Sequence, residues 1–244
     1  MAYSIDLKDR TEFAVDDPQG PTATWARYIY GIVQEFRLLG VDVKGFNIAF
    51  AGDVPLGAGM SSSAAMESCF ACALNDLFAD NKITKWDMVL AGQATEHKYI
   101  GCNCGIMDQF ASVFGQEGKL MRLDCNSREF EYYPFNPQGY KLVLLNSCVK
   151  HELAGSPYND RRQSCENVVA AIAKRYEGIE TLRDCTWEML EEVKAECSEE
   201  DIRRATYAIG ETDRVLAVCE ALKKGDYETV GQMMYETHAG LSKD

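Results

Sequence analysis

Two patterns of hydrophobic and polar residues alternate along the first part of the chain. Apolar residues at every second position are typical of strands, and apolar residues three or four positions apart are typical of helices. Residues 3–15 follow the first pattern and predict a β-hairpin. Residues 25–36 follow the second pattern and predict a helix that ends at Gly40. Residues 41–50 then predict a strand with a bulge at Gly45.

The middle of the chain continues this mixture. Residues 60–77 have helical spacing of their apolar positions. Thr84 and Asp87 have the spacing of a capping box, which predicts the start of a helix that continues to about Tyr99. Residues 120–133 predict a second hairpin.

The last hundred residues indicate mostly helix. The continuous apolar run at residues 142–145 predicts a strand that is buried on both faces. Ser156–Pro157 predicts a helix start, because Pro is favoured at the first helical position. Ser198 and Asp226 predict the N-caps of two further helices, and Gly225 predicts the end of the first of these.

The composition changes near residues 137–139, where we expect a domain boundary. We therefore expect a first domain at residues 1–138 and a second at residues 139–244. The first combines strands and helices and the second is mostly helical, which predicts an α+β protein.

Composition and charge restrict the function. The chain has 244 residues, of which 46% are hydrophobic and 26% charged, as in ordinary globular proteins. It has no apolar run long enough for a membrane span and no signal-peptide pattern, so we expect a cytoplasmic protein. The net charge of -13 argues against nucleic-acid or anionic-membrane partners, but it does not exclude ATP.

The chain contains ten cysteines, and two interpretations of them are open. Reduced cysteines that act as small hydrophobic residues are the favoured interpretation. A zinc site built from Cys69, Cys72, Cys102 and Cys104 is the alternative.

Residues 55–65 read Pro-Leu-Gly-Ala-Gly-Met-Ser-Ser-Ser-Ala-Ala, between a predicted strand and a predicted helix. Gly57 and Gly59 allow the backbone to approach a ligand, and the free N–H groups of a helix N-terminus favour a phosphate. No Lys precedes the serines, so the segment is not the common P-loop. Composition alone leaves phosphate binding and a plain connecting turn equally open.

The string P-x-G-x-G-[LM]-S-S-S-A resembles the phosphate loop of the GHMP kinases and, within that superfamily, the galactokinases. The strings at residues 25–28, 101–109 and 155–162 resemble the same family in the same order. The resemblance implies a two-domain GHMP kinase fold of the α+β class. Its N-terminal domain would be ribosomal S5 domain 2-like, and its C-terminal domain would be helical and ferredoxin-like.

The resemblance also implies an activity, which is the transfer of a phosphoryl group from ATP to the anomeric hydroxyl of galactose with Mg²⁺. It implies that Asp108 accepts the proton of that hydroxyl, that Tyr158 contacts the sugar, and that Ser63 and Glu96 bind Mg²⁺. The residues implied to bind the nucleotide are Gly57, Ala58, Gly59, Met60, Ser61, Ser62, Ser63, Trp25 and Tyr28.

Each of these residues also has an ordinary structural interpretation when it is taken alone. Asp108 has the position of a helix N-cap, Glu96 that of a solvated charge on a helix, and Tyr158 that of an aromatic residue in a first turn. Trp25 and Tyr28 have the spacing of core residues.

The chain lacks two strings that are typical of galactokinases, R-x-N-[LI]-[IL]-G-E-H-x-D and G-G-G-F-G-G. We therefore expect it to be incomplete at both ends and to have weak or no turnover. The alternatives are a non-catalytic sensor of galactose and ATP, and a kinase for a related sugar such as N-acetylgalactosamine. A kinase for homoserine or mevalonate is disfavoured by the other strings. We expect galactose and ATP as partners, and no nucleic-acid, membrane or protein partner.

Overall fold

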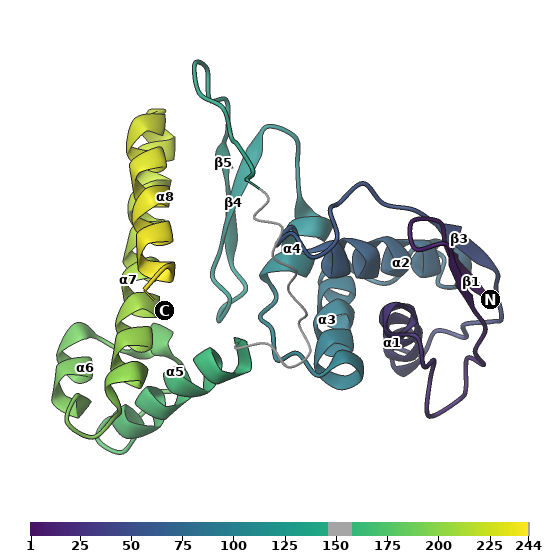
Figure 1. Ribbon diagram of the computed structural model, residues 1–244, viewed down its shortest axis with the longest axis horizontal. Coiled ribbons are helices and arrows are strands. Elements are labelled where there is room, and N and C mark those ends of the chain that lie inside the picture. The colour runs from purple at the N-terminus through teal and green to yellow at the C-terminus, as the bar shows by residue number, and fades with distance from the viewer. Residues whose placement is uncertain (146–157, 244) are drawn as a thin grey trace. The chain divides into compact units, whose positions relative to one another are not determined.

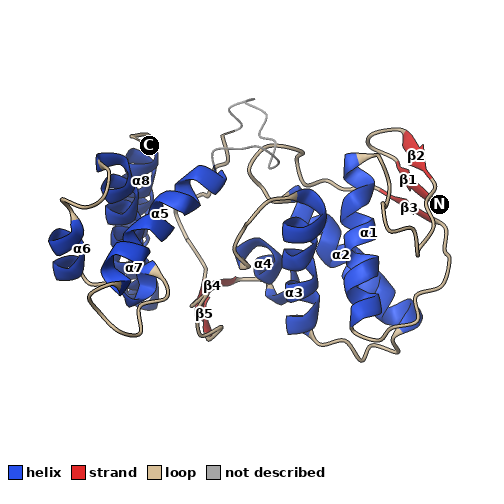
Figure 2. Ribbon diagram, turned by 90° about the horizontal axis from the view of Figure 1, so that it is seen from below, coloured by secondary structure: helices blue, strands red, loops and turns tan. Residues whose placement is uncertain are grey.

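The computed structural model describes residues 1–145 and 158–243 of the chain. These residues divide into two compact units, shown in Figures 1 and 2. Of the described residues, the first unit contains 1–115 and 144–145, and the second contains 116–143 and 158–243. The mixture of helices and strands confirms the predicted α+β class. The domain division at residue 138 stays a prediction.

The first unit combines a small sheet with four α-helices. Strand β1 lies in the centre of the sheet, antiparallel to β2 and parallel to β3. The elements are β1 (Ala2–Ser4), β2 (Asp9–Thr11), α1 (Thr24–Leu38), β3 (Ile48–Phe50), α2 (Ser62–Phe78), α3 (Lys85–Thr95), the π-helix η1 (Glu96–Ile100) and α4 (Met107–Phe114).

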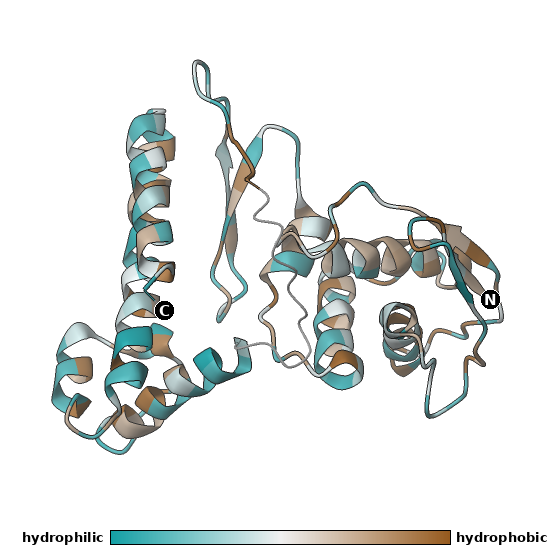
Figure 3. Cartoon of the chain, viewed as in Figure 1, coloured by the Kyte–Doolittle hydropathy of each residue, from teal (hydrophilic) through white to brown (hydrophobic). Residues whose placement is uncertain are grey.

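The core of the first unit lies mainly between α1 and α2. Ile29, Ile32 and Phe36 of α1 are fully buried, and they pack with Phe70 and Leu74 of α2. Figure 3 shows the largely apolar colour of α2. This burial fixes α2, and with it the position of the loop that leads into it.

Local signals at the helix ends are confirmed. Thr84 accepts a hydrogen bond from the backbone N–H of Asp87 at 3.1 Å and forms the predicted capping box. Gly40 follows α1 with a φ of 86°, in the left-handed region that favours glycine. The predicted strand at residues 41–50 is wrong in its length, because only β3 pairs with β1 and Gly45 forms no bulge.

The second unit combines one hairpin with a group of helices. Strands β4 and β5 pair antiparallel, with Lys119 opposite Pro134, which confirms the predicted hairpin. The elements are β4 (Lys119–Leu123), β5 (Phe130–Pro134), α5 (Tyr158–Ala173), the 3₁₀-helix η2 (Leu182–Asp184), α6 (Trp187–Val193), α7 (Glu199–Lys224) and α8 (Tyr227–Leu241). Buried residues of α5, α6 and α7 form its main core, including Val168, Ile172, Val193 and Ala205.

The predicted caps of the second unit are also confirmed. Ser198 accepts from the N–H of Asp201 at 3.1 Å, and Asp226 accepts from the N–H of Thr229 at 3.1 Å. Gly225 ends α7 with a φ of 69°. Ser156–Pro157 lies outside the described residues.

The strand predicted at residues 142–145 is wrong. These residues belong to no strand, and Leu142 and Leu145 are 65% and 91% exposed. An apolar run becomes a buried strand only where other elements cover it, and no described strand pairs with residues 142–145. Within the described ranges, no helix has the length and apolar character that crossing a membrane requires.

Candidate active site

The predicted phosphate loop leads directly into α2. Gly57, Gly59 and Ser61 adopt left-handed conformations, with φ values of 68°, 73° and 57°. A Cβ atom added to Gly59 would meet nothing within 4 Å, so this part of the loop has open space beside it. Ser61 is the N-cap residue of α2, but its side chain caps no N–H group. The N-terminus of α2 therefore keeps backbone donors that can bind an anion.

A cavity of about 370 Å³ lies beside this loop in the first unit. Ser62 and Ser63 line it from α2, and Trp25 and Tyr28 line it from α1. The indole N–H of Trp25 donates to Asp9 at 2.8 Å, which fixes the orientation of the ring. Four of the predicted nucleotide residues thus share one cavity, while residues 57–61 lie in the loop that precedes its serines.

Glu96 lies close to the loop and is almost completely buried, with 2% exposure. It is the first residue of η1, the π-helical turn that continues α3. Its Oε2 atom has no hydrogen-bond partner among the described residues. Burial raises the pKa of Glu96, the nearby Ser63 hydroxyl opposes that rise, and the negative charge of Asp108 adds to it.

Glu67 is a second buried carboxylate, and the sequence analysis missed it. It is 0% exposed and lies one turn after Ser63 on α2. Gln109 Nε2 donates to its Oε2 at 3.0 Å, and its Oε1 has no partner among the described residues. Burial and then the charge of Glu96 raise the pKa of Glu67 to about 9, although the Gln109 bond opposes this. Its spacing of four residues from Ser63 was the one available sequence signal.

Asp108 is the second residue of α4, whose N-cap is Ile106, so the N-cap interpretation of Asp108 is wrong. Its carboxylate is partly exposed, and its charge raises the pKa values of both Glu67 and Glu96. The structure therefore brings Ser63, Glu96 and Asp108 together in the first unit. Tyr158 belongs to the second unit, and its contact with the sugar stays a prediction.

The chemistry of Ser63 and Glu96 fits a magnesium ion. Mg²⁺ prefers hard oxygen ligands, and it takes one or two protein groups together with water and phosphate oxygens. The free Oε2 of Glu96 is a buried acceptor that such an ion would satisfy. Nowhere in residues 1–145 or 158–243 do three or more His, Cys, Asp or Glu side chains form a metal-binding group. The nine described cysteines, including Cys69, Cys72, Cys102 and Cys104, are free thiols.

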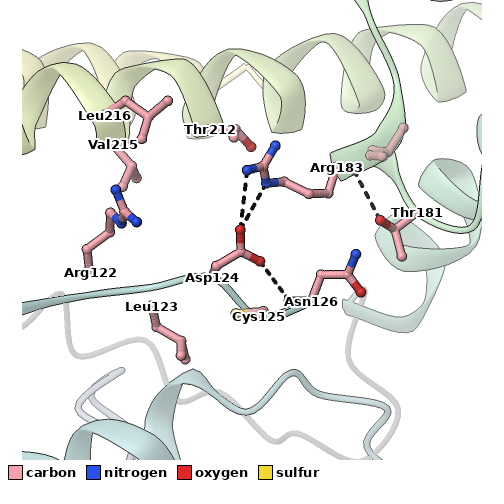
Figure 4. Close-up of a pocket in the computed structure, with 11 residues that line it drawn as sticks. Arg122, Leu123, Asp124, Cys125, Asn126, Thr181, Arg183, Thr212, Val215 and Leu216 are labelled. Atoms are coloured by element: carbon pink, nitrogen blue, oxygen red, sulfur yellow. Dashed lines mark hydrogen bonds and ion pairs between the residues drawn. The ribbon is translucent and has the colours of Figure 1, made fainter. Parts of the chain in front are cut away.

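The second unit contains a separate cavity of about 490 Å³, shown in Figure 4. The end of β4, η2 and α7 line it, with apolar side chains from Leu182, Val215 and Leu216. At its polar side, Arg183 Nη2 contacts Asp124 Oδ2 at 3.2 Å. Because Asp124 also accepts the N–H groups of Asn126 and Ser127, its carboxylate is already satisfied. None of the predicted site residues lines this cavity.

Comparison with known proteins identifies one domain of the chain. Residues 27–116 match the family described as GHMP kinases N terminal domain. This match includes the phosphate loop, Glu96 and Asp108. The chain therefore contains a GHMP kinase N-terminal domain at these residues. The resemblance predicted from the sequence strings is thereby confirmed.

Curated relatives of the chain within this family are named galactokinase. The protein of Clostridium beijerinckii is 41% identical over 90% of this chain and 57% of its own length. The protein of Thermotoga petrophila is 38% identical over 89% of this chain and 59% of its own length. The protein of Actinobacillus pleuropneumoniae serotype 5b is 37% identical over 99% of this chain and 62% of its own length. The chain thus spans 57–62% of the length of these relatives.

A solved structure supports the same assignment. The crystal structure of Lactococcus lactis galactokinase complexed with galactose has a TM-score of 0.91 to this chain at 30% sequence identity. The similarity covers 100% of this chain and 63% of the Lactococcus chain. The two-domain GHMP kinase fold implied by the sequence strings is consistent with this likeness.

Proposed function

We propose that this chain has the function of a galactokinase, which transfers the γ-phosphoryl group of ATP to the anomeric hydroxyl of galactose. The observation that carries the proposal is the buried carboxyl group of Glu96, which has an acceptor oxygen without a described partner and lies near Ser63 and the charge of Asp108. Several relatives bear the name galactokinase, and the Lactococcus protein was crystallised with galactose.

The nucleotide would occupy the cavity beside the loop. The uncapped N–H groups at the start of α2 would bind phosphate oxygens, because both the donors and the helix dipole favour negative charge there. Trp25 and Tyr28 would lie against the adenine, since both side chains line that cavity. Ser63 and Glu96 would hold Mg²⁺, which neutralises charge on the phosphates when it is bound.

Asp108 would act on the sugar hydroxyl. A carboxylate is ionised at neutral pH, so it can accept a proton, although it is intrinsically a weak base. Phosphoryl transfer depends mainly on positioning and charge neutralisation, and a fixed carboxylate at the acceptor supplies positioning. Tyr158 would contact the sugar, as the family resemblance implies.

The first test of this proposal is nucleotide binding by the chain itself. Calorimetric titration with ADP should show saturable binding that is tighter in Mg²⁺ than in EDTA. Glu96→Ala should weaken binding in Mg²⁺ by at least about 10-fold, since even the loss of an outer-shell partner typically weakens a metal site 10–100-fold. Binding in EDTA should change little. Glu131→Gln, which alters an exposed carboxylate of the second unit, is the matched control.

Turnover tests the assignment of the reaction. Galactose-dependent ADP release should fall sharply in Asp108→Asn while Mg²⁺-dependent ADP binding stays close to that of the wild type. Nucleotide binding that ignores Mg²⁺ and Glu96 would contradict the proposed site. A sugar panel that includes N-acetylgalactosamine separates the related-sugar alternative, and binding of both ligands without turnover would support the sensor alternative. The expectation of weak or no turnover and the expected cytoplasmic location stay predictions.

A further inference from the structure

We infer that Glu67 is a positioning residue, whose hydrogen bond to Gln109 fixes α4 so that Asp108 stays beside the phosphate loop. The inference rests on the proposed function for the role of Asp108. The hydrogen bond between α2 and α4 belongs to the described structure, so its effect on α4 can be tested without turnover.

The first argument comes from the geometry of α2. Ser63 and Glu67 are four residues apart, so their side chains lie on the same face of this helix. The Ser63 hydroxyl lies near Glu96 of η1 and opposes the rise of its pKa, whereas Glu67 accepts a hydrogen bond from Gln109 in α4 at 3.0 Å. One face of α2 is therefore directed at two separate elements of the site. Because Gln109 directly follows Asp108 in the first turn of α4, the hydrogen bond from Gln109 to Glu67 acts on that carboxylate.

The second argument comes from the packing around this bond. A Cβ atom added to Gly92 of α3 would come within 2.7 Å of Gln109 Cγ and 3.2 Å of Glu67 Oε2. The pair thus lies directly on the backbone of α3, in a space that only glycine leaves open. Since Glu67 and Gln109 are 0% and 2% exposed, bulk water cannot replace either partner.

The third argument is that this single bond is the described link between the two side chains. Glu67 Oε1 and Gln109 Oε1 both lack hydrogen-bond partners among the described residues. A buried polar side chain that loses its one bond is left fully uncompensated. The start of α4 should then move to find new partners, and Asp108 should move with it.

The test compares five variants of the chain by amide hydrogen exchange. Glu67→Leu and Gln109→Leu remove one partner each, and the double variant removes both. Glu67→Gln keeps an acceptor oxygen for Gln109 and is the conservative variant. Asn75→Leu is the matched control, because Asn75 is a buried polar residue of α2 that bonds Ile83 at the opposite end of the helix.

We expect amides in residues 106–110 to exchange about 10–100-fold faster in Glu67→Leu and Gln109→Leu than in the wild type. The double variant should lose less protection than either single variant, because it leaves neither buried polar side chain without a partner. Glu67→Gln should keep the protection of these amides. Asn75→Leu should lower the unfolding temperature without a selective effect on residues 106–110. Unchanged protection in Glu67→Leu, or equal loss in Glu67→Gln, would overturn the inference.

Steady-state kinetics tests whether the Glu67–Gln109 hydrogen bond affects the reaction. In protein with measurable galactose-dependent turnover, Glu67→Leu should lower kcat about 10-fold or more and change the KM for ATP less than about threefold. Asn75→Leu should change neither. If the wild type binds no Mg²⁺-nucleotide, the proposed function fails, but the exchange experiment still decides whether Glu67 positions α4. A fall in kcat without any change in exchange would also count against the inference.

Discussion

Glu67 and Glu96 in the first unit are 0% and 2% exposed, whereas the side chains of Asp124 and Glu131 in the second unit are 21% and 56% exposed. Burial raises the pKa of both buried carboxyl groups. Hydrogen bonds from the backbone of Ser127 to Asp124, and from the Tyr133 hydroxyl to Glu131, lower the pKa of the exposed ones.

The difference in burial shows that the two units use carboxyl groups in different ways. A carboxylate at the surface keeps its water and gains modestly from its partners. A carboxylate inside loses its water, so its retention costs stability unless other groups or a ligand compensate it. The first unit contains such uncompensated groups beside the phosphate loop, which is the pattern of a functional site. The following predictions test that contrast.

The largest effect should be the pH dependence of stability in the first unit. The pKa of Glu67 is about 9 in the folded chain against an ordinary 4.5, so the folded chain holds a proton that the unfolded chain releases between these values. The unfolding free energy should therefore fall as pH rises in this window, by up to about 1.4 kcal/mol per pH unit. Glu67→Gln should flatten this slope in urea titrations between pH 6 and 8. Equal slopes in both proteins would show that Glu67 releases no proton on unfolding.

A second effect concerns the same substitution at two glycines. Gly92→Ala in α3 places a methyl group against Gln109 and Glu67, and overpacking of this kind typically costs about 1–3 kcal/mol. Gly231→Ala in α8 has no atom within 4 Å, so the better helix propensity of alanine should stabilise the second unit by about 1 kcal/mol. Urea unfolding of the two variants should give changes of opposite sign, and a shared sign would contradict the packing argument.

The third effect is the loss of one exposed helix cap. Ser198→Ala removes the acceptor for the N–H of Asp201 at the start of α7 and should cost about 1 kcal/mol. Ser198→Thr keeps a hydroxyl acceptor and should stay close to the wild type. Thermal unfolding of both variants measures the difference, and an equal loss in the two would mean that the cap contributes nothing.

The smallest effect should come from the surface ion pair of the second unit. Asp124→Asn removes the partner of Arg183, and an exposed pair typically contributes under about 1 kcal/mol. Because hydrogen bonds keep the pKa of Asp124 below its ordinary 3.8, this stabilisation is present at neutral pH. It should be lost as pH falls through the lowered pKa, and high salt should reduce it. Urea titrations of the wild type and Asp124→Asn at neutral and acidic pH measure this. If the substitution costs more unfolding free energy at acidic pH than at neutral pH, the prediction is wrong.

The sequence predicted those parts of the structure that local chemistry determines. Thr84, Ser198 and Asp226 cap helices through bonds to residues three positions away, and such bonds need no distant partner. The family strings identified Ser63 and Asp108, and the family's twelve-residue spacing before Asp108 identified Glu96. The structure places these three residues in one unit.

The remainder depends on contacts between elements. An apolar run at residues 142–145 cannot show whether another strand covers it, and here these residues stay exposed. Glu67 was missed because a single Glu in a helix is usually solvated. Its burial comes from Gln109 and from the bare backbone at Gly92, which lie 42 and 25 residues away in sequence. The π-helical turn at Glu96 has no pattern of its own that could have predicted it.

The π-helical turn η1 fixes the length of the segment between the carboxylates of Glu96 and Asp108. The backbone oxygen of Glu96 accepts the N–H groups of both Gly101 and Cys102, at 2.9 and 3.0 Å. Deleting one residue of Glu96–Ile100 would convert the wide turn to an ordinary one and rotate everything downstream by about 100°. The twelve-residue interval from Glu96 to Asp108 should therefore tolerate changes of residue type but not of length.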